Sequence, residues 1–103
     1  GPLHQVVPLS IYLKQVEPNG DIIEMNIWAV PITPAYPEGE VYSLVYVSEG
    51  KRIIGYDNEH HGTGKSNHHK HLRNKIMPYL YKDMWAVISD FMDDVEKLRK
   101  GEL

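Results

Sequence analysis

The stretch VYSLVYVSEGKRIIGYD, Val41–Asp57, decides the fold. Its first part, Val41–Val47, alternates with a period of two, and both sets of alternate side chains are largely apolar. A strand that is apolar on both faces is typical of the middle of a sheet. The tight-turn sequence Ser48–Lys51 then predicts an antiparallel neighbour over Arg52–Asp57. Gly55 inside this neighbour indicates a bulge or a close backbone approach.

Two more strands are predicted before this stretch, over Leu9–Val16 and Asp21–Val30, because both segments alternate with a period of two. They are joined through Asn19 and Gly20, a pair that tolerates positive φ and is the strongest short hairpin signal. The segment Pro31–Glu40 carries three prolines, which remove backbone donors, so we expect a loop there. The N-terminal half is therefore a meander of antiparallel strands.

The C-terminal part predicts a helix over Asp83–Lys100, because apolar residues recur there at spacings of three and four. Asp83 is suited to the N-cap position. We expect Trp85 and Phe91 on its apolar face to enter the core. Residues 68–72 favour a short additional strand, in which His69 and His71 project to one side and His68, Lys70 and Leu72 to the other. The predicted fold class is α+β, with a four- to five-stranded, mainly antiparallel sheet and one long C-terminal helix packed on one face.

Composition bounds the class of protein. The chain has 103 residues, of which 42% are hydrophobic and 24% charged, as in one small globular domain. We expect residues 6–103 to form a single α+β domain and residues 1–5 to be a disordered tag remnant. The chain has no cysteine, which excludes thiolate metal sites and fits a cytoplasmic location. No apolar run approaches the roughly 20 residues of a membrane span, so no membrane partner is expected.

Charge is distributed unevenly along the chain. The net charge is only −3, yet residues 60–82 contain five lysines and arginines and no acidic residue. The whole chain has 11 basic and 14 acidic residues. Outside residues 60–82 it therefore has 6 basic and 14 acidic residues, a net charge of −8. A localised basic patch on an acidic body can hold a phosphate backbone.

The same region holds most groups able to carry chemistry, because five of the six histidines lie between residues 56 and 73. Histidine titrates near neutrality and can pass protons to and from a ribose hydroxyl and a leaving oxygen. Basic side chains can stabilise the charge on a pentavalent phosphate. The candidate catalytic residues are Tyr56, Asp57, His68, His69 and His71, and the candidate phosphate-binding residues are Lys65, Lys70, Arg73 and Lys75.

Three other interpretations compete with metal-independent acid–base chemistry. GTGKS (Gly62–Ser66) resembles the end of a phosphate-binding loop, but Glu59 stands where that motif needs a glycine, so we reject it. A divalent metal at His60, His61, His69 and His71 would make a hydrolase, although the spacing matches no strong zinc signature. A histidine-rich basic loop could also dock a nucleic acid or an acidic protein without catalysis.

The order of motifs in the second half of the chain resembles the TumE family of toxin–antitoxin toxins. The resemblance rests on YDN (Tyr56–Asn58), on HHKH (His68–His71), on the following Pro78-Tyr79 pair and on the DF…DV pattern of the helix. It implies a small prokaryotic, cytoplasmic toxin that is neutralised by a cognate helix-turn-helix antitoxin. It also implies a nucleic-acid-directed activity, that of a ribonuclease. Separately, we expect no obligatory cofactor. A homodimer is left open.

Overall fold

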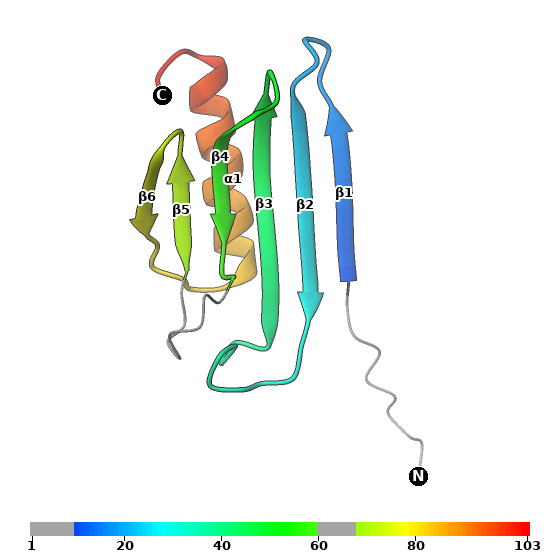
Figure 1. Ribbon diagram of the computed structural model, residues 1–103, viewed down its shortest axis with the longest axis vertical. Coiled ribbons are helices and arrows are strands. Elements are labelled where there is room, and N and C mark those ends of the chain that lie inside the picture. Colours follow the sequence, from blue (N-terminus) through cyan, green and yellow to red (C-terminus); the bar gives the residue numbers. More distant parts are fainter. Residues whose placement is uncertain (1–9, 60–67) are drawn as a thin grey trace.

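The computed structural model describes residues 10–59 and 68–103. Within these residues six strands form one antiparallel sheet in chain order, and a single helix follows them (Figure 1). The α+β class and the C-terminal helix are thereby confirmed. The elements are β1 (Ser10–Val16), β2 (Ile22–Ala29), β3 (Glu40–Ser48), β4 (Lys51–Asp57), β5 (His69–Leu72), β6 (Lys75–Pro78) and α1 (Met84–Arg99).

The sheet has one strand more than the four or five predicted. The short strand expected at residues 68–72 is confirmed as β5, and β6 pairs with it in register, from His69 opposite Pro78 to Leu72 opposite Lys75. Arg73 adopts a left-handed φ of 54° at the turn between them. A four-residue edge strand that ends in proline has almost no sequence signal. The predicted tag remnant, residues 1–5, lies outside the described residues.

The core lies between α1 and one face of the sheet, where α1 packs on β3 and β4. Figure 1 shows the helix behind these two strands. Its buried residues include Val87, Phe91 and Val95, which meet the fully buried Tyr42 and Leu44 of β3. We call this face of the sheet the helix side and the opposite face the open side. The prediction that β3 is central is confirmed by its place third among the six strands.

The helix begins as predicted and packs with a different orientation. Asp83 is the N-cap, and its carboxylate accepts a hydrogen bond from the Ala86 amide at 2.8 Å. The predicted burial of Trp85 is wrong, because its side chain is 82% exposed. Asp94, by contrast, is buried on the inner face of the helix. The stripe that faces the core is therefore formed by Val87, Phe91 and Val95, and Trp85 lies on another side of the helix.

A β-bulge in β4 changes which way Arg52 points. Tyr46 pairs with Ile54, but Val47 pairs with Arg52, so Ile53 is an extra residue without its own partner. Strict alternation would place Arg52 on the helix side together with Ile54. The bulge moves Arg52 to the open side instead, while Ile53 packs against the core. The predicted irregularity near Gly55 therefore exists, two residues earlier in the strand.

Candidate functional site

Three of the predicted catalytic residues meet on the open side, where β4 and β5 pair. Asp57 lies opposite His69 in the register, and Gly55 lies opposite His71. The Asp57 carboxylate is 2.8 Å from His71 Nε2 and 3.7 Å from His69 Nδ1. The two imidazole rings are 6.2 Å apart. One half-buried carboxylate therefore serves two histidines, and we call Asp57, His69, His71 and Arg52 the open-side cluster.

Arg52 completes this cluster and determines which tautomer neutral His71 adopts. Its guanidinium lies 3.0 Å from His71 Nδ1 and can only donate, so Nδ1 accepts the hydrogen bond. Nε2 of the neutral ring then carries the proton and donates to Asp57. Arg52 can reach this position because Gly55 has no side chain; a Cβ on Gly55 would lie 2.9 Å from Arg52 Cδ. Both ring nitrogens of His71 are therefore occupied.

His69 differs from its neighbour in this respect. Its Nδ1 is beyond hydrogen-bond distance from Asp57, although it lies within the range of an ion pair. Its Nε2 has no partner among the described residues, and about a quarter of the side chain is exposed. A nitrogen that is free on one side of the ring, with a carboxylate near the other, is the arrangement that a general base requires. Within the open-side cluster, His69 is the group able to exchange a proton with a ligand.

Two other predicted residues, Tyr56 and Lys70, lie on the helix side, because side chains alternate along β4 and β5. The Tyr56 hydroxyl donates to buried Asp94 at 2.5 Å, and Lys70 Nζ lies 2.8 Å from the same carboxylate. Burial, followed by this hydrogen bond, raises the pKa of Tyr56 well above its ordinary value. The sheet separates both groups from Asp57. The predicted site residues therefore included side chains that lie on opposite faces of the sheet.

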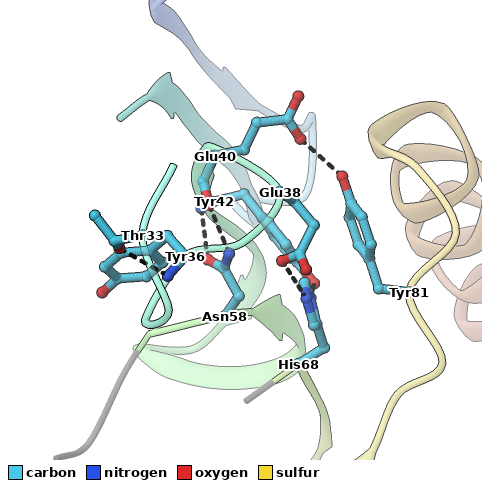
Figure 2. A network of polar contacts seen from close by, with 8 residues as sticks. All are labelled: Thr33, Tyr36, Glu38, Glu40, Tyr42, Asn58, His68 and Tyr81. Atoms are coloured by element: carbon cyan, nitrogen blue, oxygen red, sulfur yellow. Dashed lines mark hydrogen bonds and ion pairs between the residues drawn. The ribbon is translucent and has the colours of Figure 1, made fainter. Parts of the chain in front are cut away.

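His68 belongs to a third set of contacts, at the end of the sheet where β3 begins (Figure 2). Its Nε2 lies 2.8 Å from a Glu38 carboxylate oxygen, and its Nδ1 lies 2.7 Å from the Tyr42 hydroxyl. Its ring also stacks on Tyr81 at 4.3 Å, and Tyr81 donates to Glu40. Burial raises the pKa of Tyr42, so its phenol stays protonated. His68 therefore joins three segments of the chain, with both ring nitrogens occupied.

Asn58, the last residue of the YDN motif, ties the same end of the sheet together. Its buried side chain accepts a hydrogen bond from the Tyr42 amide at 2.9 Å and donates to the Glu40 carbonyl at 2.7 Å. These bonds extend the β3–β4 pairing by one residue beyond Asp57. The motif therefore contributes Tyr56 to the core, Asp57 to the open side and Asn58 to the strand end.

The remaining predicted residues do not join the open-side cluster in the described structure. Arg73 lies at the far end of β5 and donates to the Leu103 carbonyl, and Lys75 is exposed on β6. Lys65, His60 and His61 lie outside the described residues. No three His, Cys, Asp or Glu side chains of residues 10–59 and 68–103 form a group that could hold a metal ion. Of the four histidines predicted as metal ligands, only His69 and His71 lie in the described part of the chain.

The open side also carries aromatic residues that the sequence did not single out. Tyr12 lies in the same cross-strand row as Asn26, Ser43 and Asp57, and Trp28 lies one row further on. Both aromatic side chains are exposed. Strands are spaced about 4.8 Å apart, so Tyr12 lies about 14 Å from Asp57 across the sheet. The alternation of residues 9–30 predicted the two faces of this hairpin but not their use.

The structure defines a class: a small α+β protein whose sheet is covered by a helix on one side and presents a histidine–carboxylate cluster on the other. The family model described as Toxin TumE matches residues 4–99, nearly the whole chain. The chain therefore belongs to the TumE toxin family. No curated protein and no solved structure shows significant similarity to it. In the part of the chain that the structure describes, no helix is long and apolar enough to cross a membrane.

Proposed function

We propose that this toxin acts on RNA through the open side of its sheet and cleaves it with His69 as the proton-transferring group. The observation that carries the proposal is the Asp57 carboxylate shared by two histidines, of which His71 is held on both nitrogens and His69 is free on one. Metal-independent cleavage of RNA needs one histidine able to take a proton and a fixed charge environment around it.

The proposed step begins when Nε2 of neutral His69 removes the proton of a ribose 2′-hydroxyl. The 2′-oxygen then attacks the adjacent phosphorus, the bond to the 5′-oxygen breaks, and that oxygen takes a proton from a water molecule. The hydroxide so formed takes the proton from His69, which returns to its neutral form. The products are a 2′,3′-cyclic phosphate and a 5′-hydroxyl. Asp57 stabilises the imidazolium that forms on His69.

The mechanism divides the predicted catalytic residues by role. His71 and Arg52 act as positioning residues, because they hold the Asp57 carboxylate through a continuous chain of hydrogen bonds. Tyr56 and His68 support the scaffold through Asp94 and Glu38. In the cell, the proposal places the toxin in the cytoplasm with a cognate helix-turn-helix antitoxin as its partner, as the family implies.

The test compares the purified protein with His69→Ala and with Asp93→Ala, a control on the exposed side of α1. Loss of a general base lowers rates by about 10²-fold or more, so His69→Ala should reduce RNA cleavage by at least that factor. Asp93→Ala should cleave like the parent chain. The cyclic phosphate at the new 3′ end identifies the chemistry. Undiminished cleavage by folded His69→Ala would overturn the proposal.

A second candidate function is RNA binding without cleavage, which the exposed Tyr12 and Trp28 on the open side favour. Bases stack on aromatic side chains with little dependence on sequence, at about 1–3 kcal/mol per base. A single-stranded oligoribonucleotide should then quench Trp28 fluorescence, and binding should weaken steeply with salt. Quenching without any cyclic-phosphate product would favour this function over the ribonuclease.

A further inference from the structure

The sheet carries an apolar surface on its helix side that α1 does not cover. Ile11 and Leu13 of β1 are each 42% exposed and lie opposite Ile27 and Met25 of β2, whose side chains face the core. They therefore point to the helix side, where β3 and β4 are the strands nearest to α1. No described element covers the helix side of β1, whereas Ile23 and Ile27 of β2 are buried in the core. Figure 1 shows α1 behind the middle of the sheet, away from β1.

One side of α1 faces this uncovered part of the sheet. Arg99 forms an ion pair with Glu17, which lies in the turn between β1 and β2. Met92 and Trp85 precede Arg99 by seven and fourteen residues, so they share its side of the helix. Both are exposed, Trp85 to 82%. Ile11, Leu13, Met25, Met92 and Trp85 together line one surface, which we call the helix-side shelf.

The shelf is wide enough to hold one more helix beside α1. Six strands spaced about 4.8 Å apart span about 24 Å, whereas a helix with its side chains is about 10 Å across. Helices packed side by side on a sheet lie about 8–10 Å apart. A second helix laid next to α1 would therefore lie over β1 and β2, with Met92 and Trp85 beside it and Ile11 and Leu13 below it.

A second copy of this chain does not supply that helix from its described residues. The apolar stripe of α1 is already buried, with Val87, Phe91 and Val95 fully enclosed in its own core. The rim of the shelf carries two carboxylates and one guanidinium, because Glu17 at the turn and Glu96 on α1 both form ion pairs with Arg99. The two carboxylates leave one negative charge in excess at this rim. The surface is complementary to an apolar stripe flanked by lysines and arginines.

We propose that the helix-side shelf binds a basic amphipathic helix of a partner protein, with apolar residues at i, i+3 or i+4 and i+7 seated on Leu13, Met25 and Met92. Such a helix completes the second layer of the domain and buries apolar surface that the chain leaves in water. The proposal does not depend on the RNA chemistry of the open side. It concerns only the opposite face of the sheet.

The chain's two tryptophans provide matched reporters for the two sides. Trp28→Phe leaves Trp85 beside the shelf, and Trp85→Phe leaves Trp28 on the open side. The probe is the purified protein encoded by the reading frame next to the gene for this chain. Its addition should shift the emission of Trp85 to shorter wavelength and leave the emission of Trp28 unchanged. A shift of Trp28 alone would place the partner on the open side and overturn the proposal.

Substitutions on the two faces of β1 test the same proposal through the affinity between the chain and its partner. Leu13→Lys puts a cation on the shelf, and Tyr12→Lys puts one on the other face of β1. We expect Leu13→Lys to weaken binding at least about tenfold, or about 1.4 kcal/mol, and Tyr12→Lys to change it little. Leu13→Lys should still cleave RNA like the parent chain, which separates this test from that of His69.

Three results would contradict the proposal. The first is that the neighbouring protein does not bind the chain. The second is that Tyr12→Lys weakens binding as much as Leu13→Lys does. The third is self-association of the chain alone, seen as a concentration-dependent Trp85 shift together with a doubled mass in sedimentation, because a second copy would then occupy the shelf.

Discussion

Removal of the Asp94 carboxylate is the most informative change to the scaffold. Asp94 is buried on the inner face of α1 and holds Tyr56 of β4 and Lys70 of β5 at 2.5 and 2.8 Å. Asp94→Ala leaves a buried phenol without an acceptor, which costs about 1–3 kcal/mol. It also leaves an ammonium without its counter-ion, at a cost reduced because Lys70 is partly exposed. We expect a total loss of about 3 kcal/mol.

The assay is urea unfolding followed by far-ultraviolet circular dichroism. A domain of this size has a free energy of unfolding of about 5–15 kcal/mol, so the expected loss is easily measured. Each kcal/mol lowers the melting temperature by about 4–8 °C, which predicts a decrease of at least about 12 °C. Asp93→Ala is the matched control, because the neighbouring carboxylate is exposed. It should change the free energy of unfolding by less than about 0.5 kcal/mol.

A double-mutant cycle separates the ion pair from the rest of the effect. Lys70→Met alone leaves the buried Asp94 carboxylate with only the Tyr56 hydroxyl, so it should destabilise the chain. In the Asp94→Ala background the same change removes an unpaired ammonium and should cost little or nothing. Equal costs of Lys70→Met in both backgrounds would refute the ion pair as the source of stability. An Asp94→Ala loss no larger than that of Asp93→Ala would refute the whole assignment.

Three further predictions concern other parts of the fold. Burial and the hydrogen bond to Asp21 raise the pKa of Tyr46 to about 12, so the folded state favours the neutral phenol. The free energy of unfolding should therefore be unaffected below about pH 10 and should fall as the pH rises toward 12. Alkaline unfolding followed by circular dichroism measures this. Asp83→Ala should lose about 1 kcal/mol in urea unfolding, because it removes the helix N-cap. Asn58→Ala should lose about 2 kcal/mol or more in the same assay, because it leaves a buried amide and a carbonyl of β3 unpaired; a loss below about 0.5 kcal/mol would contradict this role.

The sequence predicted the elements that carry strong periodic or capping signals. Alternation located β1, β2 and β3, the tight turn before Arg52 predicted β4, and Asp83 marked the start of α1. Alternation also placed His69 and His71 on one side of β5 and Lys70 on the other, as the structure has them. The contacts of Asp57 with both histidines do not follow from alternation along the strands. They depend on the register of β4 against β5, which the local sequence does not determine.

Features that escaped prediction have physical causes. Arg52 was missed because a one-residue bulge reverses the side to which a strand residue points, and bulges have no reliable sequence signal apart from nearby glycines. Trp85 was misplaced because helical periodicity does not distinguish a stripe that faces the core from an adjacent stripe left bare. Glu38 was missed because it lies 30 residues from His68 in the chain. Only the folded sheet brings these two residues together.

The two proposals place the partner and the RNA on opposite sides of one sheet. Binding of the partner and inhibition of RNA cleavage can therefore be tested separately. A helix on the shelf cannot touch Asp57 or His69, because the sheet lies between them. A partner that occupies only the shelf should therefore bind the chain without inhibiting RNA cleavage. Full inhibition by the helix alone would show that the partner's helix reaches the open side.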